Sequence, residues 1–207
     1  MNKLFLTLLL FCSAVALAEN TSRKFIASKA TKSVLEISVS DGTYLIKPYS
    51  NHIVETTFLP KGEKFNPDSH AVVLEPEAKG TKYKETKSEI SYSTTGIEVR
   101  VEKSPFKISY FFNDKLLLSE KNGYTKKDST EILDFTIDNT EALYGGGARA
   151  LGMNRRSNRL RLYNKAQYGY GDRAELLNFT IPMVLSSKIY AVHFDNPAIG
   201  YLDLDSN

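Results

Sequence analysis

Residues 35–46 are LEISVSDGTYLI, and this stretch decides the fold. The apolar side chains of Leu35, Ile37 and Val39 alternate with polar ones, which is the period of a β-strand with one buried face. Asp41-Gly42 follows, and apolar residues resume directly after it. An Asp-Gly pair between two such runs is typical of a β-hairpin. The stretch therefore predicts two antiparallel strands joined by a tight turn.

Patterns of the same kind recur along the chain. Runs of strand length follow one another with turn residues between them, and no stretch after Glu19 keeps a helical period for three turns. This spacing predicts an all-β sandwich or barrel. Two charged stretches, 61–68 and 79–87, are expected to be loops. Further strands are expected at 97–101, 106–112, 116–118, 132–137, 159–163, 179–185, 189–194 and 199–204.

The first 18 residues have the pattern of a secretory signal peptide. Lys3 precedes an apolar stretch at 4–11, and a small-x-small cleavage site lies at 16–18. We therefore expect an exported protein, periplasmic or extracellular, whose folded domain covers 19–207. The apolar stretch is too short to span a membrane, so no membrane partner is expected. Cys12, the one cysteine, lies in this segment, so the mature domain is expected to lack disulfides.

Residues 144–171, YGGGARALGMNRRSNRLRLYNKAQYGYG, include three consecutive glycines. The segment 145–150 matches the dinucleotide-binding pattern G-x-G-x-x-A, which requires a strand before it and a helix after it. Gly152 and Asn154 would interrupt such a helix, and the neighbouring patterns predict strands. The pattern therefore favours a tight strand exit, where no Cβ fits.

Seven basic residues between positions 149 and 173 are interleaved with tyrosines. Basic and aromatic residues together are typical of single-strand nucleic-acid binding. Arg159 and Arg161, however, alternate with leucines, so we expect them on the solvated face of one strand. The whole chain has 27 basic and 24 acidic residues. This near balance, together with export, argues against a nucleic-acid partner.

The segment from Tyr168 to Asp172 combines tyrosines, glycines and a carboxylate. Such a loop suits a sugar, because aromatic rings stack on its C–H face and carboxylates accept hydrogen bonds from its hydroxyls. An ordinary connection with locally packed tyrosines explains the same residues equally well. The residues alone leave both hypotheses open.

The chain shows no pattern of a metal, cofactor or catalytic site. His52, His70 and His193 lie far apart in sequence and have no cysteine partner. A glycosidase requires two carboxylates on opposite sides of the scissile bond, and no spacing selects such a pair, Asp195 and Asp203 included. We therefore expect no cofactor, no metal and no catalytic residue here.

The residues from Leu143 to Asn196 resemble the N-terminal domain of glycoside hydrolase family 31, which contains α-glucosidases, α-xylosidases and α-transglucosylases. In that domain a Tyr-Gly-x-Gly segment precedes an Asn-Arg-Arg region and an Arg-x-x-x-aromatic-Asn strand. A Tyr-Gly-Tyr-Gly loop, an Ile-Pro strand and an aromatic-Asp-Asn strand end follow. Here these motifs lie at 144–147, 154–156, 159–164, 168–171, 181–182 and 194–196.

The resemblance implies a galactose-mutarotase-like β-sandwich that precedes a (β/α)₈ barrel. Both catalytic aspartates of the family sit on that barrel, so this chain alone is expected to be inactive and to have its own barrel as partner. A loop, here Gln167 to Arg173, is implied to reach over the barrel mouth and shape the sugar subsites. Tyr170, Asp172 and Arg173 are then expected to bind an α-linked oligosaccharide.

Two functions remain open at this point. The first is the accessory domain of an exported, retaining α-glucan hydrolase or 4-α-glucosyltransferase; the second is a stand-alone exported carbohydrate-binding sandwich without catalytic activity. A strand pattern still runs at Leu204, so we expect the sandwich to be cut short near Asn207, before the barrel. The chain departs from the family pattern at Ala148-Arg149 and Ala166-Gln167, which leaves the sugar preference open.

Overall fold

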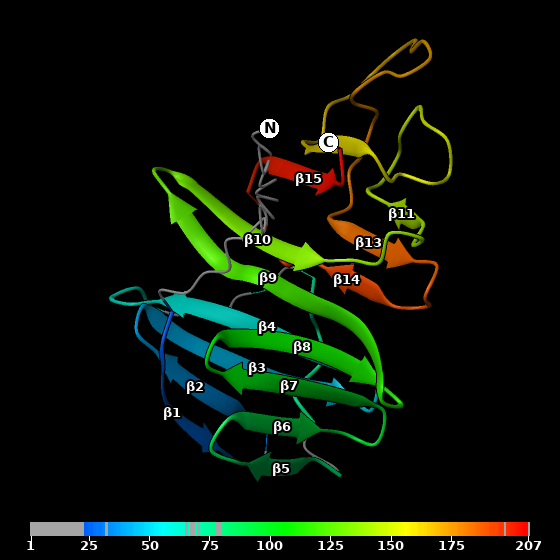
Figure 1. Ribbon diagram of the computed structural model, residues 1–207. Helices are drawn as coiled ribbons and strands as arrows, with labels where there is room; N and C mark the ends of the chain where they lie inside the picture. The colour runs from blue at the N-terminus through cyan, green and yellow to red at the C-terminus, as the bar shows by residue number, and fades with distance from the viewer. Residues whose placement is uncertain are drawn as a thin grey trace, which may run out of the picture.

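The computed structural model describes residues 23–206, except for 32, 65, 67–68, 70, 78–79 and 197. Within these residues every helix or strand element is a β-strand, which confirms the all-β prediction (Figure 1). The expected signal peptide, residues 1–18, lies outside this range. In the described part of the chain, no helix could cross a membrane.

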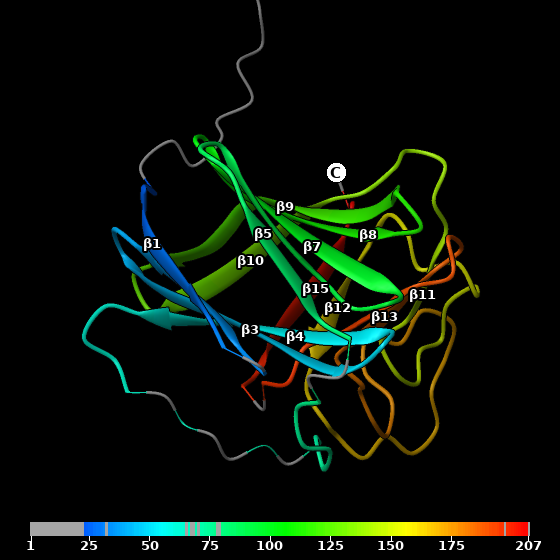
Figure 2. The ribbon, with the colours of Figure 1, turned by 90° about the horizontal axis from the view of Figure 1, so that it is seen from below.

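Two large antiparallel sheets form the lower half of the molecule in Figure 1. One has four strands in the order β1-β2-β3-β4, and the other has six in the order β10-β9-β8-β7-β6-β5. Figure 2 shows them as two facing layers, the four-stranded sheet in blue and the six-stranded sheet in green. The four strands are β1 (Phe25–Ala30), β2 (Leu35–Val39), β3 (Gly42–Ser50) and β4 (Ile53–Pro60). The six strands are β5 (Lys82–Glu85), β6 (Glu89–Ser93), β7 (Ile97–Lys103), β8 (Phe106–Phe112), β9 (Lys115–Lys127) and β10 (Thr130–Thr136).

The core between the two sheets follows from the alternation in the sequence. The register pairs Leu35 of β2 with Ile46 of β3, so their side chains share one face. On the opposite sheet, Val101 of β7 is paired with Ile90 of β6 and Ile108 of β8. All five side chains are fully buried in a single cluster. A shift of one residue would turn each strand's apolar set toward solvent, so burial specifies the register.

Two smaller sheets form the upper part of the molecule, one in the order β11-β13-β14 and one pairing β12 with β15. They enclose a separate buried cluster that contains Leu143, Leu160, Val184, Leu202 and Leu204. The strands are β11 (Leu143–Gly145), β12 (Asn158–Leu162), β13 (Met183–Ser186), β14 (Ala191–His193) and β15 (Gly200–Leu204). This upper part carries all the motifs of the family resemblance.

Hydrogen bonds to the buried carboxylate of Glu141 connect the start of β11 to the hairpin of β13 and β14. Glu141 is 2% exposed and accepts hydrogen bonds from the hydroxyls of Ser186 and Tyr190. The ammonium of Lys188 lies 3.9 Å from its other oxygen. Because a buried carboxylate without partners would be costly, these contacts make the connection specific.

The structure corrects several expected boundaries. The first hairpin turns at Ser40-Asp41, because Gly42 is already paired with Val39. Residues 82–85, expected in a charged loop, form β5, an edge strand whose four side chains are all exposed and therefore show no apolar alternation. The strand expected at 179–185 begins only at Met183, because the preceding proline has no N–H to give to a ladder.

A charged cluster joins the two large sheets on the side of β9. Arg23 is 5% exposed and donates to both carboxylate oxygens of Asp41, to the Tyr44 hydroxyl at 2.6 Å and to the Tyr124 carbonyl at 2.6 Å. The Tyr44 hydroxyl in turn donates to the carboxylate of Glu120 at 3.3 Å. Tyr44 lies on β3 and Glu120 on β9, so the cluster connects both layers through polar contacts.

This cluster predicts a pH-dependent stability. Burial raises the pKa of Glu120 from 4.5 to about 7, although the nearby charge of Arg23 opposes this. A carboxyl that holds its proton more tightly when folded stabilises the fold below its unfolded pKa, and the contribution is lost as the pH rises through the folded value. Glu120→Gln cannot ionise. We therefore expect the unfolding free energy of the variant, relative to wild type, to rise between pH 4.5 and 7 and then to level off.

Urea unfolding of residues 19–207 at several pH values measures this difference. Glu36→Gln is the matched control, because Glu36 is exposed on β2 and lies outside the buried charged cluster. A difference for Glu120→Gln that stays constant from pH 4.5 to pH 8 would show that folding does not raise the pKa of Glu120.

Candidate functional site

The three consecutive glycines end β11 at a close approach of three backbone segments. Gly145, Gly146 and Gly147 all have positive φ angles, of 105°, 78° and 84°. A Cβ on Gly145 would lie 2.4 Å from the carbonyl oxygen of Met183, and one on Gly147 would lie 2.6 Å from the Cα of Thr180. Among the described residues that follow, no helix begins, so a dinucleotide-binding turn is excluded. The tight strand exit is confirmed.

The loop from Gln167 to Arg173 projects away from both large sheets, in gold at the top of Figure 1. Backbone contacts hold its ends: the amide of Gln167 donates to the side chain of Asn178, and the amide of Arg173 donates to the carbonyl of Ala150 at 3.1 Å. Its tip is exposed, with 92% of Tyr168 and 62% of Tyr170 accessible. The local packing that an ordinary connection was expected to give these tyrosines is therefore not found.

An open depression of about 510 Å³ lies beside this loop. One side is formed by Tyr170, Asp172 and Arg173, and the other by residues 149–152, which follow the glycine exit. The structure thus places the three predicted residues around one space. The sequence marked Arg149 only as part of the basic run and of a departure from the family pattern, and residues 150–152 not at all as site residues, because the two segments, about twenty residues apart, meet only through tertiary contacts.

Asp172 and Arg173 are the two charged side chains at the depression that have no side-chain hydrogen bond or ion pair in the described chain. Among the described residues, no ion pair or side-chain hydrogen bond engages Asp172, and Arg173 does not pair with it. Arg173 itself adopts a left-handed backbone conformation with φ of 62°, which is uncommon for a residue other than glycine and is frequent at functional sites. A carboxylate acceptor, a guanidinium donor and a phenol are therefore presented together.

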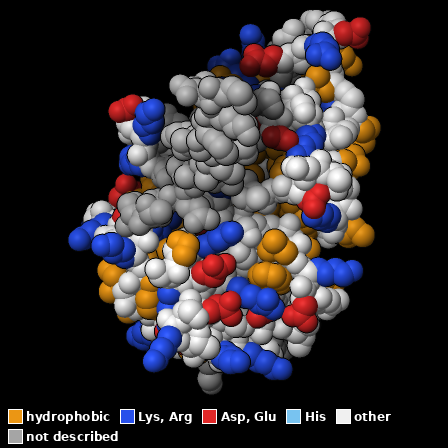
Figure 3. Space-filling view, in the orientation of Figure 1, with side chains coloured by type: hydrophobic (Ala, Val, Ile, Leu, Met, Phe, Trp, Pro, Cys, Tyr) orange, Lys and Arg blue, Asp and Glu red, His pale blue; other side chains and the backbone are white. Residues whose placement is uncertain are grey.

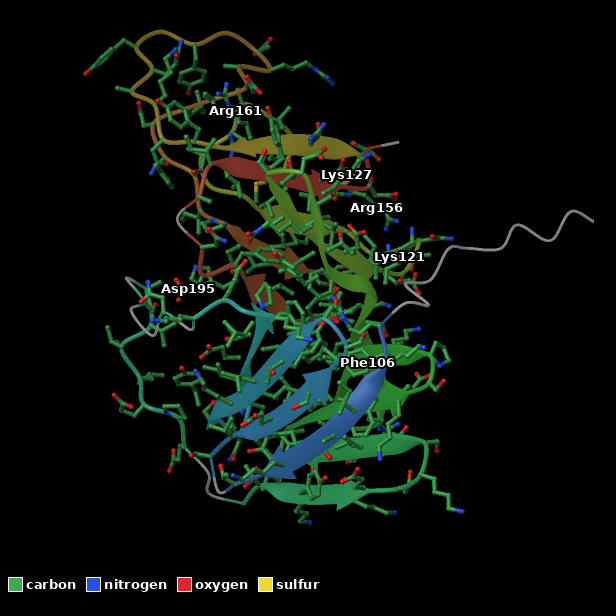
Figure 4. All side chains as sticks on the ribbon, turned by 90° about the vertical axis from the view of Figure 1, so that its left-hand side faces the viewer. Phe106, Lys121, Lys127, Arg156, Arg161 and Asp195 are labelled. Carbon is green, nitrogen blue, oxygen red and sulfur yellow. The ribbon has the colours of Figure 1, made fainter. Side chains whose placement is uncertain are left out.

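Several arginines of the basic run make contacts within the fold. Arg155 is 8% exposed and donates to the carbonyls of Leu151 and Gly152. Arg156 pairs with Asp205 at 2.7 Å. Figure 4 shows Arg156 and Arg161 at opposite ends of the ribbon formed by β12 and β15. Because these arginines have partners, they do not form a continuous cationic track.

The two arginines expected on the solvated face of β12 differ. Arg159 is exposed, with its guanidinium 4.2 Å from the ring centroid of Tyr201, whereas Arg161 is half-buried. Elsewhere, Figure 3 shows acidic and basic side chains interspersed over the outer face of the six-stranded sheet. Arg100 there pairs with both Glu98 and Asp114. Arg159 and Arg100 thus each lie against a partner side chain of the described chain.

The described histidines and acids do not form a metal centre. No group of three or more His, Asp or Glu side chains in the described ranges could hold a metal ion. His193, expected as a structural histidine within a strand, does lie on β14 but is exposed there. The polar and aromatic side chains that line the depression are those of Arg149, Tyr170, Asp172 and Arg173.

Comparison with protein families identifies the domain. The family model described as the glycosyl hydrolase 31 N-terminal galactose mutarotase-like domain matches residues 43–203. The chain belongs to glycoside hydrolase family 31. The resemblance seen in residues 143–196 is thereby confirmed, and so is the galactose-mutarotase-like β-sandwich. This family 31 domain includes the glycine exit, the loop and the depression.

Individual relatives agree with this assignment. "Alpha-glucosidase 2" of Bacillus thermoamyloliquefaciens is 27% identical over 173 residues, which are 80% of this chain and 22% of that protein. A family 31 dextranase of Flavobacterium johnsoniae, solved with isomaltotriose, superposes with a TM-score of 0.80 at 24% identity, over 88% of this chain and 23% of that one. A family 31 α-xylosidase from a soil metagenome, solved with xylose, gives 0.71 at 18% identity, over 88% and 30%. The chain thus spans less than a third of each relative.

The glycine exit leads to a stability prediction. At Gly147 an alanine would have to adopt a positive φ of 84° and its Cβ would meet the backbone of Phe179, Thr180 and Ile181. We expect Gly147→Ala to lower the free energy of unfolding by about 2 to 4 kcal/mol. Denaturant unfolding of residues 19–207 measures the change.

Gly152→Ala is the matched control, because nothing lies within 4 Å of the position of its Cβ. Its effect should stay within about 0.5 kcal/mol. If both alanine variants were equally stable, the close approach at the glycine exit would not exist.

Proposed function

We propose that this family 31 domain is the N-terminal accessory domain of an exported enzyme acting on α-glucans, either a hydrolase or a 4-α-glucosyltransferase. In this proposal the loop from Gln167 to Arg173 contributes a sugar subsite, and catalysis takes place on a barrel domain of the same protein. The observation that carries it is the depression in which Tyr170, Asp172 and Arg173 meet. Family membership and the relatives' names, an α-glucosidase and a dextranase, support it.

The side chains at the depression match the chemistry of a neutral sugar. Tyr170 offers a flat ring, which can stack on the C–H face of a pyranose. Asp172 can accept hydrogen bonds from two adjacent hydroxyls, and Arg173 can donate to ring or glycosidic oxygens. Since the depression is open, the oligosaccharide would be covered on its other side by the barrel. Glucose units bound here would lie next to the scissile bond.

The proposal assigns no catalytic residue to this chain. Retaining glycosidases use two carboxyl groups about 5 to 5.5 Å apart, one as nucleophile and one as acid/base. At the depression Asp172 is the only carboxylate among the lining residues. It can therefore bind a sugar but cannot by itself perform the two carboxylate steps.

Residues 19–207 are accordingly expected to show no glycosidase activity. The purified domain is assayed with p-nitrophenyl α-glucoside, maltotriose and isomaltotriose, and product release is compared with a buffer blank. Turnover that disappears when an aspartate within this chain is replaced would contradict the assignment of catalysis to the barrel.

Substitution of Asp172 tests the sugar subsite in the complete enzyme. Asp172→Ala removes a charge-assisted acceptor, which contributes about 1.5 to 3 kcal/mol. We expect kcat/KM for the oligosaccharide substrate to fall by roughly one to two orders of magnitude. The melting temperature should not fall, because this exposed loop acid contributes little to the core.

Glu36→Ala provides the control. Glu36 is an exposed acid on β2 of the four-stranded sheet, and no residue of that sheet lines the depression. Its kcat/KM should equal that of wild type. An Asp172→Ala enzyme with unchanged kcat/KM on maltotriose and isomaltotriose would end the case for a sugar contact at this residue.

A further inference from the structure

Arg149 is a buried cation that is held by backbone oxygens. It is 8% exposed, and its Nε donates to the carbonyl of Gly146 at 3.1 Å. Its Nη1 donates to the carbonyl of Glu175 at 2.9 Å, and its Nη2 to the carbonyl of Arg161 at 2.7 Å. Within the described chain it forms no ion pair. Burial and the charge of Arg155 lower its pKa, so the three carbonyls must offset the cost of placing a charge here.

The three carbonyls belong to three different segments that meet below the loop. Gly146 is part of the glycine exit, and Arg161 lies one residue before the end of β12, from which the chain leaves toward the loop. Glu175 lies just after the loop, in the segment that leads back from it. One guanidinium therefore joins the outgoing and returning limbs of the loop. Arginine suits this role because its planar group directs several N–H donors from one rigid fork.

Two backbone hydrogen bonds continue the same connection. The amide of Arg173 donates to the carbonyl of Ala150 at 3.1 Å, and the amide of Ala148 donates to the carbonyl of Phe179 at 3.0 Å. The segment that carries Arg149 thus touches the returning limb at Arg173, Glu175 and Phe179. Arg149 also lines the depression itself, together with Tyr170 and Asp172.

The side chains above this connection have little support of their own. Within the described residues, neither Tyr170 nor Asp172 has a side-chain hydrogen bond or ion pair, and both are exposed. Their placement therefore depends on the backbone of the loop. That backbone is fixed at its base, where Arg149 binds both limbs.

We propose that Arg149 is a positioning residue, which clamps the two limbs of the loop through the carbonyls of Arg161 and Glu175 and so sets the affinity of the depression for its sugar. This inference rests on the proposed function, because it assumes that Tyr170 and Asp172 face a sugar. It adds a residue that need not touch the sugar and a physical reason why the loop is ready to bind.

Hydrogen exchange measures the clamp without any sugar. In the complete protein, Arg149→Met keeps the apolar stem but removes every donor. We expect the amides of Arg173 and Ala174, which donate to the carbonyls of Ala150 and Gly171, to exchange roughly tenfold to a hundredfold faster, while β2, β3 and β7 exchange as in wild type. Arg149→Lys should accelerate exchange less than Arg149→Met does. One ammonium keeps the charge and a donor, but it cannot reach three separated carbonyls. Arg159→Met is the control, since this arginine is exposed on β12, and it should leave the loop unchanged.

Two variants of Arg149 are measured so that the test does not depend on the folding of either one alone. If Arg149→Met does not fold, Arg149→Lys carries the same measurement with the charge retained. Exchange of the Arg173 and Ala174 amides at the wild-type rate in a folded variant would overturn the clamp. Faster exchange confined to the loop supports it.

Steady-state kinetics on isomaltotriose and maltotriose then test the consequence for binding. We expect Arg149→Lys to raise KM roughly tenfold and to change kcat less, at a temperature well below the melting point. With Asp172→Ala the loss should be less than additive, because both substitutions disable the same loop. A merely structural arginine would lower the melting temperature and leave KM unchanged.

The outcomes separate this inference from the function on which it rests. If Asp172→Ala raises KM and Arg149→Lys does not, the positioning role is overturned and the sugar subsite stands. If the loop exchanges faster in Arg149→Lys but neither substitution affects sugar kinetics, the proposed function fails, and the positioning role toward a sugar fails with it.

Discussion

The close approach at Gly145–Gly147 is the constraint on which the upper part of the molecule depends. Three successive residues take positive φ angles and leave no space for a Cβ against Met183, Leu160 and Thr180. This brings β11, β12 and the chain that leads into β13 into contact around one point. The loop and the depression exist because the backbone turns here. A side chain at Gly145 or Gly147 would meet backbone atoms and move the segments apart.

Buried charges then make this arrangement specific. Arg23, Glu141 and Arg149 are each at most 8% exposed, and each is satisfied by hydrogen bonds between segments that are distant in sequence. A partly satisfied buried charge is strongly destabilising, so such groups disfavour alternative packings. Arg23 does this between the two large sheets, Glu141 at the entry to β11 and Arg149 at the loop. The hydrophobic clusters supply the stability, and these polar contacts determine which segments meet.

The sequence predicts most of the sandwich core, because alternation reports directly on burial. The hairpin of β2 and β3, and the pair β7 and β8, are expected from apolar residues two positions apart and are found. β5 could not be expected, since all four of its side chains face solvent and carry no pattern. The sequence predicted only one side of the candidate site. Tyr170, Asp172 and Arg173 were expected as sugar contacts, but residues 149–152 were not. Arg149 and Arg155 belonged to an apparent basic run, and only tertiary contacts show that both are buried.

In the proposed function, the loop of this family 31 N-terminal domain presents Tyr170, Asp172 and Arg173 to a sugar. A structure of the complete protein with isomaltotriose or maltotriose bound tests this most directly. The account predicts that a sugar hydroxyl lies within hydrogen-bonding distance, about 2.5 to 3.2 Å, of a carboxylate oxygen of Asp172. A bound oligosaccharide with residues 167–173 turned away from it, and with Asp172 in solvent, would contradict the account.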